Sequence, residues 1–351
     1  MLTSSPPGKG EDSGRDLRSR CRFAVHSRAL VRKKMTAPWV TWPAAAALGL
    51  LLDRALGEPP AALHPVAWFG RAMLVAERAG YRDSRAAGAR HAALGVLAGV
   101  GAGACLRSAV LGTWLAAAGR CLGESALTVA RALDRGDLPA ARAALPALVG
   151  RDPAGLDEGE LARAVVESVA ENTVDALVAP AFWAAICGAP GAFGYRAVNT
   201  LDAMVGHRSR RYHAYGWASA RLDDVAGYLP ARLTAALVAG VRPGRAAAVW
   251  RAVRSQAPAH PSPNAGVAEA AFAAALGLRL GGCNRYGDRI ERRPWVGQGR
   301  PAAGPDIEAA VRLSSDVSWL LTAILAAAGV AGAPVRRLAG DARRGRADPA
   351  G

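Results

Sequence analysis

Three carboxylates lie four residues apart in the segment ESVAENTVDALVAP, which spans residues 167 to 180. On a helix, Glu167, Glu171 and Asp175 would fall within about 80° of arc and face one way. Like charges at this spacing repel one another, and the repulsion grows at the edge of a low-dielectric region. We therefore expect a positive partner. Arginine is the ordinary partner, whereas Mg²⁺ or a cationic amine would make this face a binding site.

A second polar block, residues 195 to 235, adds further acids and bases. Asn199 and Asp202 are three residues apart, as are Arg221 and Asp224, so each pair would share a helix face. The turn between the pairs is strongly basic and holds His207, Arg208, Arg210 and Arg211. Arginine forks match phosphate oxygens, which suggests a phosphorylated ligand. A basic loop that anchors membrane topology is the alternative, and the loop alone favours it.

Two proline-rich loops carry histidines. His64 lies in the segment LGEPPAALHPV, and His260 opens HPSPNAG, where Asn264 precedes a helix that carries Glu269. A histidine before a proline is usually a packed turn residue. In this setting either one could instead act as a base.

Long uncharged runs predict the elements that position these residues. Residues 176–195 and 317–335 contain twenty and nineteen residues without a charge, and about twenty apolar residues cross a bilayer. Weaker candidates are 38–52, 91–119 and 225–241; Arg107 interrupts the second, so it either buries that charge or breaks into two helices. We predict an all-α, polytopic membrane protein with four to five membrane-associated helices.

Turn and cap signals refine this prediction. Asp157 and Glu160 form an Asp variant of the capping box, so a helix should begin near Glu158. If residues 176–195 crossed as one helix, Glu171 and Asp202 would lie on opposite membrane faces. The turn formers Gly188, Pro190 and Gly191 instead predict a hairpin that returns Asp202 to the side of Glu171.

Composition sets the domain organisation. The chain has 351 residues, 51% of them apolar, and a formal charge of +16. Its basic ends, residues 1–34 and 336–351, predict disordered tails around one membrane-embedded domain at 35–335, and Met35 is a possible start. No nucleic-acid motif accompanies the basic tails, so we expect no nucleic-acid partner. The five cysteines show no metal-ligand spacing and are expected to be reduced.

Five segments in order carry a family resemblance: DRALGEPPAALHPVAWFGR, ESVAENTVDALVAPAFW, YRAVNTLDAMVGHR, GWASARLDDVAGYLPARLTA and HPSPNAGVAEAAFAAALGLRLGG. In these segments the chain resembles the adenosylcobinamide-phosphate synthase family of cobalamin biosynthesis, called CobD or CbiB. The resemblance extends from about residue 50 to 325. It implies a multi-pass cell-membrane enzyme that joins adenosylcobyric acid to (R)-1-aminopropan-2-ol or its O-phosphate, forming an amide on the f propionate.

The family's reaction is written with ATP, and we expect Mg²⁺ beside it, because a carboxylate and an amine condense only through an activated acyl group. The chain has no Walker loop, so the polar blocks must bind the nucleotide. Our expected catalytic residues are Glu167, Glu171, His64 and His260. Our expected substrate-binding residues are Asn172, Asp175, Asn199, Arg208, Arg211, Arg221 and Asn264, and our expected metal ligands are Asp202, Asp223 and Asp224.

Two other classes of function stay open from the residues. In a membrane-embedded, Mg²⁺-dependent prenyltransferase, ENTVD and NTLD would be a diverged pair of metal-binding motifs, but such an enzyme should show a longer Asp-rich repeat. A corrinoid transporter would predict inverted repeats of broken helices, and no repeat is visible in the sequence.

Overall fold

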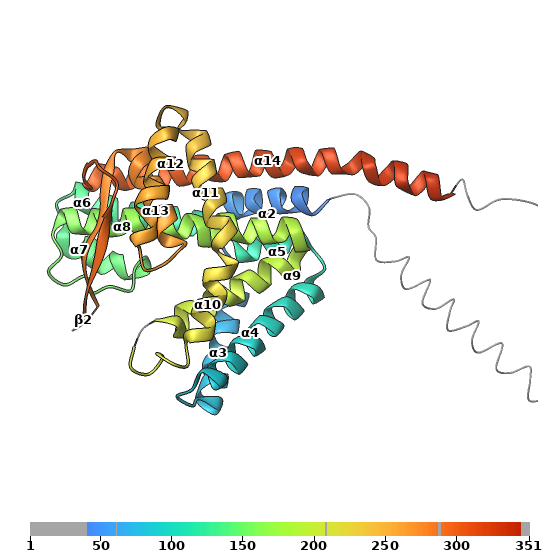
Figure 1. Cartoon of the computed structure of the whole chain (residues 1–351), viewed down its shortest axis with the longest axis horizontal. Coiled ribbons are helices and arrows are strands. Elements are labelled where there is room, and N and C mark those ends of the chain that lie inside the picture. Colours follow the sequence, from blue (N-terminus) through green and yellow to red (C-terminus); the bar gives the residue numbers. More distant parts are fainter. Residues whose placement is uncertain (1–40, 61, 208, 287–288, 345–351) are drawn as a thin grey trace, which may run out of the picture. The chain divides into compact units, whose positions relative to one another are not determined.

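A computed structural model describes residues 41–60, 62–207, 209–286 and 289–344. The predicted basic extension, residues 1–34, lies outside them, as does Arg208. Helices dominate the described part (Figure 1). The helices are α2 (Trp42–Leu56), α3 (Pro65–Gly80), α4 (Arg85–Leu106), α5 (Ala109–Ala116), α6 (Gly119–Asp134), α7 (Leu138–Ala144), α8 (Glu158–Thr173), α9 (Ala179–Leu201), α10 (Trp217–Ala226), α11 (Tyr228–Val241), α12 (Ala246–Ser255), α13 (Ala265–Leu276) and α14 (Gly304–Arg344).

Short elements complete the described part. The 3₁₀ turns are η1 (Leu145–Ala147), η4 (Pro243–Arg245) and η5 (Ala257–Ala259), and the π turns are η2 (Val174–Val178) and η3 (Asp202–Gly206). The strands β1 (Leu278–Tyr286), β2 (Arg289–Val296) and β3 (Arg300–Pro301) form a small sheet in the order β2-β1-β3, with β1 antiparallel to β2 and parallel to β3. The predicted helical class is confirmed, and this sheet is an addition that the sequence did not predict.

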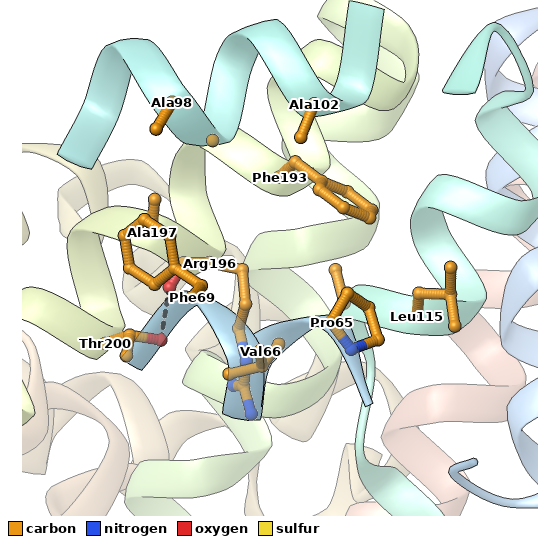
Figure 2. Close-up of a pocket in the computed structure, with 12 residues that line it drawn as sticks. Pro65, Val66, Phe69, Ala98, Ala102, Leu115, Phe193, Arg196, Ala197 and Thr200 are labelled. Atoms are coloured by element: carbon orange, nitrogen blue, oxygen red, sulfur yellow. Dashed lines mark hydrogen bonds between the residues drawn. The ribbon is translucent and has the colours of Figure 1, made fainter. Parts of the chain in front are cut away.

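Glycines allow α4 and α9 to approach closely. A Cβ at Gly99 would lie 2.6 Å from the Cβ of Ala197, and one at Gly103 would lie 2.5 Å from the carbonyl oxygen of Ala189. Such small-residue stripes are typical of helix contacts in membranes. Figure 2 shows this close approach of the two helices: Ala98 and Ala102 of α4 face the second half of α9. The helix α4 ends at Leu106, and the following residue, Arg107, is exposed with φ 55°, so the run 91–119 breaks into two helices.

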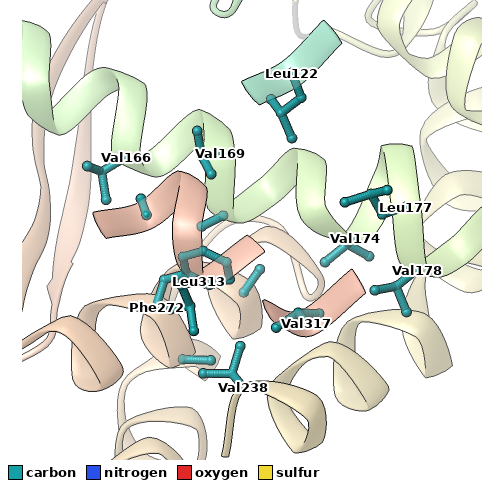
Figure 3. Close-up of a cluster of buried hydrophobic side chains, with 14 of the residues drawn as sticks. Leu122, Val166, Val169, Val174, Leu177, Val178, Val238, Phe272, Leu313 and Val317 are labelled. Atoms are coloured by element: carbon teal, nitrogen blue, oxygen red, sulfur yellow. The ribbon is translucent and has the colours of Figure 1, made fainter. Parts of the chain in front are cut away.

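The centre of the described part is α8. Asp157 and Glu160 form the predicted capping box at its start, with the Glu160 N–H donating to Asp157 at 2.8 Å and the Asp157 N–H donating to Glu160 at 3.0 Å. Residues 161–170 are buried on every face, as expected of a helix surrounded by others. Figure 3 shows Val166 and Val169 of α8 among side chains of α11, α13 and α14.

The chain reverses direction at Gly188. This residue has φ 67° and ψ −152°, a conformation open essentially only to glycine, within a stretch that is otherwise helical. The Tyr195 hydroxyl donates to Asp175 at 2.9 Å, although a straight helix would separate residues twenty positions apart by about 30 Å. The predicted hairpin is therefore confirmed. Its two arms are bounded by the π turns η2 and η3, which carry Asp175 and Asp202.

Three helical segments are long and apolar enough to cross a membrane: Arg85–Leu106, Glu158–Gly206 and Gly304–Ala331. The second contains the reversal at Gly188, so its length does not measure one crossing. The weaker candidates α2 and α11 have 15 and 14 residues, below the usual spanning length. The helix α14 continues to Arg344, past residue 335, where the sequence placed the end of the domain.

Candidate functional site

A half-buried group of carboxylates, here called the acidic group, lies where the hairpin meets α10. It comprises Glu171, Asp175, Asp202 and Asp223. The Asn199 amide nitrogen lies 3.2 Å from an oxygen of Asp175 and 3.5 Å from an oxygen of Asp223. Because this nitrogen carries two hydrogens, it can donate one to each carboxylate. The hairpin thus brings together the carboxylates of the two polar blocks.

The acidic group carries more negative charge than its hydrogen bonds balance. Within the described residues, the side chains of Glu171 and Asp202 have no hydrogen-bond or ion-pair partner. Burial, and the negative charges of Asp175, Asp202 and Glu171, raise the pKa of the Asp223 carboxyl to about 8. A cation bound here would relieve this repulsion.

The acidic group fits one kind of metal ion better than another. Across the described ranges, no set of three or more His, Cys, Asp or Glu side chains is arranged to enclose a metal. Mg²⁺ does not need such an enclosure, because it usually keeps several waters and binds one or two carboxylates together with substrate phosphates. Asp175 and Asp223, which Asn199 holds together, suit that mode. Of the three predicted metal ligands, Asp202 and Asp223 belong to this group.

Asp224 and the predicted phosphate-binding arginines form ion pairs outside the acidic group. Asp224 accepts from Arg221 at 2.8 Å, so this i,i+3 pair does share a helix face. Arg211 pairs with the buried Glu77 of α3 at 2.9 Å and stacks on Tyr81, which fastens the basic turn to α3. Arg208 lies outside the described residues.

Glu167 lies apart from the acidic group, in a set of buried ion pairs. One carboxylate oxygen accepts from Arg151 at 2.6 Å, and the other accepts from Arg163 at 3.1 Å and from the Gly281 N–H at 2.9 Å. Only 2% of Glu167 is exposed. These contacts join α8 to the loop before it and to β1. Glu167 is thus a buried charge that is compensated by its partners and holds these elements together.

His260 forms a second buried pair. Its Nε2 lies 3.6 Å from Oε2 of Glu269, and neither atom has a hydrogen-bond partner within the described residues. The other oxygen of Glu269 is 3.3 Å from Arg293. Burial lowers the pKa of His260, which keeps the imidazole neutral near pH 7 and able to accept a proton.

His64 is the N-cap of α3, because its Nδ1 accepts from the Val66 N–H at 3.2 Å. Its Nε2 lies 3.6 Å from Glu58. Burial, and the nearby charge of Arg196, lower the pKa of His64. The Nδ1 atom of His64 therefore caps a helix, and the imidazole ring is neutral near pH 7.

Arg196 is a residue that the sequence did not single out. Its Nε is buried without a hydrogen-bond partner in the described part of the chain. Figure 2 shows its side chain extending from α9 toward Val66, beside an apolar cavity of about 80 Å³. Its charge acts on Glu58 and His64. The only signal in the sequence was its position at the charged end of the run 176–195.

The remaining predicted residues hold backbone in place. Asn172 donates to the carbonyl oxygen of Ser168 on its own helix at 2.9 Å. Asn264 donates to the carbonyl oxygen of Asp224 at 3.0 Å and accepts from Arg232 at 3.1 Å. Asn264 therefore fixes the end of α10, and with it Asp223, against α13.

Three membrane-length helical segments and a half-buried group of four carboxylates together define a helical membrane protein with an acidic site. The family model described as CobD/Cbib protein matches residues 46–314, and the chain belongs to this family. It is 47% identical over 289 residues to the cobalamin biosynthesis protein CobD of Mycobacterium tuberculosis strain CDC 1551, covering 79% of this chain and 92% of that one.

Relatives from other bacteria indicate the same family. The chain is 44% identical over 302 residues to the cobalamin biosynthesis protein CobD of Chromobacterium violaceum, covering 81% of this chain and 95% of that one. It is 42% identical over 304 residues to that of Klebsiella pneumoniae, covering 78% and 93%. No solved structure matches the chain. The resemblance drawn from the sequence is confirmed at the level of the family and of cobalamin biosynthesis.

Proposed function

We propose that this protein forms the amide bond between the f propionate of adenosylcobyric acid and (R)-1-aminopropan-2-ol or its O-phosphate, at the cell membrane and with ATP. Family membership supports a corrinoid substrate. The observation that carries the proposal is the acidic group, in which a reversal at Gly188 places Asp175 and Asn199 beside Asp223 of another helix.

The chemistry explains why such a group is needed. A carboxylate must lose one oxygen to become an amide, and ATP would supply the leaving group as phosphate, with Mg²⁺ shielding the phosphate charge. Asp175 and Asp223 would hold the ion, and Asn199 would keep them together. Glu171, which has no partner within the described residues, would accept the proton that the amine releases as the amide forms.

The test is product formation by the full chain, purified in detergent or liposomes. Adenosylcobyric acid, aminopropanol phosphate, Mg²⁺ and ATP are supplied, and the corrinoid product is followed by mass. We expect an amide product that requires ATP and falls at least 100-fold in Glu171→Gln and Asp175→Asn. Glu308→Gln is the matched control and should retain activity, because Glu308 is an exposed residue of α14 whose ion-pair partner among the described residues is Arg312, at 3.0 Å.

The proposal fails if no amide forms with either amine. Uptake of corrinoid into sealed vesicles under those conditions would then assign the protein to the transporter class. Amide formation that Glu171→Gln and Asp175→Asn leave unchanged would keep the reaction and reject the acidic group as its site.

A further inference from the structure

The apolar cavity beside Arg196 lies between α3, α4, α5 and α9 and has a volume of about 80 Å³ (Figure 2). Ala98 and Ala102 of α4 line it and are exposed, so the cavity opens on the α4 side. The helix α4 is long and apolar enough to cross a membrane, and 53% of Leu94, one turn before Ala98, is exposed. In a bilayer this opening therefore faces lipid.

The walls of the cavity are almost entirely apolar. Phe69, Leu115 and Phe193 contribute its larger side chains, and the hydroxyl of Thr200 donates to the carbonyl oxygen of Arg196 on the same helix, at 2.7 Å. Apolar cavities take up hydrocarbon rather than water. The cavity therefore suits a short stretch of hydrocarbon chain that enters from the lipid side.

Arg196 is the one charged side chain among the described residues that line the cavity. Its Nε is buried, and its guanidinium group has no hydrogen-bond or ion-pair partner in the described part of the chain. A guanidinium group carries five N–H donors, and burying such donors without an acceptor is costly. An acceptor with negative charge therefore fits beside Arg196.

Nearby carboxylates do not supply that acceptor. The charge of Arg196 acts on Glu58 and Asp175, but within the described ranges neither carboxylate lines the cavity or forms an ion pair with Arg196. Glu58 lies 3.6 Å from His64, and Asp175 accepts from the Tyr195 hydroxyl at 2.9 Å. Both carboxylates are thus engaged with other groups.

The two ends of the cavity differ in polarity. Arg196 lies on the part of the returning arm that leads to the acidic group, whereas Phe193 is one turn nearer the tip of the hairpin. On the facing wall, Ala102 is next to Gly103, which packs on Ala189 near that tip. Hydrocarbon toward the tip and a cation toward the acidic group match an amphiphile with an anionic head.

We propose that this cavity binds an anionic phospholipid, with the lipid phosphate on Arg196 and the first carbons of an acyl chain alongside Phe193. Arginine forks match phosphate oxygens, and basic pockets between membrane helices bind anionic headgroups. The described lining residues include no carboxylate for the cationic group of a zwitterionic headgroup, which favours an anionic lipid. This inference does not rest on the proposed reaction.

Titration of the full chain in detergent with phosphatidylglycerol or phosphatidylcholine of matched acyl chains tests the assignment. Native mass spectrometry counts the lipids that stay bound. We expect one phosphatidylglycerol to bind at least 10-fold more tightly than phosphatidylcholine, and Arg196→Gln to remove this preference. Arg107→Gln is the matched control and should keep the preference, because Arg107 is an exposed arginine directly after α4 that does not line the cavity.

Ala102→Phe tests the apolar part of the cavity and leaves Arg196 in place. The new ring would fill the cavity from its open side, so we expect it to weaken phosphatidylglycerol binding at least 10-fold. Ala104→Phe is its control, since Ala104 is exposed on another face of α4 and does not line the cavity. Circular dichroism would check that each variant folds. Should Arg196→Gln fail to fold, the variants at Ala102 and Ala104 still decide the assignment.

Equal affinity for the two lipids, or a preference that Arg196→Gln retains, overturns the assignment. A preference lost equally in Arg107→Gln also overturns it, since that result indicates a general attraction to surface charge. Unchanged phosphatidylglycerol binding in Ala102→Phe rejects the cavity as the place of the acyl chain.

Hexyl phosphate and inorganic phosphate separate a lipid from a water-soluble anion. We expect wild type to bind hexyl phosphate at least 10-fold more tightly than inorganic phosphate, and Ala102→Phe to lose that difference. Equal affinity of wild type for the two probes would make Arg196 a site for a water-soluble anion and would reject the lipid.

Discussion

Asn199 links carboxylates that come from separate elements, Asp175 of η2 and Asp223 of α10. The Tyr195 hydroxyl supplies a further hydrogen bond to Asp175. Both donors lie on the returning arm of the hairpin, one helical turn apart. The returning arm therefore stabilises the Asp175 carboxylate of the outgoing arm, and loss of a single donor should be measurable.

Tyr195→Phe removes the hydroxyl and keeps the ring. We expect the free energy of unfolding to fall by about 1 to 3 kcal/mol, because the lost bond joins a buried donor to a carboxylate. Denaturation in detergent micelles would measure this. Tyr228→Phe is the matched control, since that ring is 50% exposed and its contact with Arg232 survives the change. An equal loss in the two variants would contradict the assigned role of the Tyr195 hydroxyl.

Asp223 should make stability depend on pH. Its folded-state pKa, about 8, lies above the ordinary 3.8, so between these values the folded chain holds more protons than the unfolded chain. Its contribution to stability is therefore present at low pH and is lost as pH rises toward 8. Under the proposed function, Mg²⁺ would bind the ionised carboxylate and restore stability at high pH, whereas at pH 6 it would have to displace a proton.

We therefore expect Mg²⁺ to raise the unfolding temperature more at pH 9 than at pH 6. Asp223→Asn should reduce the rise at pH 9, and thermal unfolding with and without Mg²⁺ would measure both. Identical Mg²⁺ responses of wild type and Asp223→Asn at the two pH values would remove Asp223 from the cation site.

At the scale of elements, the reversal at Gly188 decides whether the acidic group forms. Gly188→Ala puts a side chain on a backbone with φ 67° and against the Trp42 ring, 3.3 Å away. We expect a loss of about 1 to 3 kcal/mol in unfolding free energy, with lower affinity for Mg²⁺. Gly101→Ala is the control, because a Cβ there meets nothing within 4 Å and alanine favours a helix interior. A stable Gly188→Ala with unaltered Mg²⁺ affinity would argue against the hairpin.

The contact of α4 with α9 depends on the absence of side chains. Gly99→Leu would force the helices apart, since a Cβ alone would lie 2.6 Å from Ala197. We expect overpacking to lower the free energy of unfolding by about 1 to 3 kcal/mol. Gly101→Leu, two residues along on the open side of the same helix, should be tolerated. Comparing the unfolding midpoints of the two variants in detergent tests the packing, which equal midpoints would contradict.

Local signals explain how much of this fold and site the sequence could predict. The cap at Asp157 and the turn at Gly188 each depend on residues within a few positions of one another, so their patterns were sufficient to predict them. The pattern around Arg107 left two outcomes open, a buried charge or a break into two helices, and the structure shows the break. The partners of Glu167 and Arg211 were not predictable. Gly281 and Glu77 lie 114 and 134 residues from them in the chain, and only the packing of distant elements brings them near.

On the scale of the whole described bundle, the hairpin and α4 end at the same level. Gly103 packs on Ala189, so Cys105 of α4 and Cys187 at the hairpin tip lie at one end of the paired helices, and both thiols are free and exposed. We expect the two cysteines to respond alike to a membrane-impermeant maleimide added to sealed vesicles. Variants that keep one cysteine at a time, with the others changed to serine, would measure this. Labelling from opposite faces would contradict the arrangement.

The two π turns have a consequence for comparing relatives. Each fits one residue more into a turn than an α-helix does, and one residue corresponds to about 100° of rotation. A relative one residue shorter at 174–178 or 202–206 would rotate every later side chain of that arm relative to the preceding one. Such a gap in an alignment would thus mark a changed orientation at the site, even where all of its acids were retained.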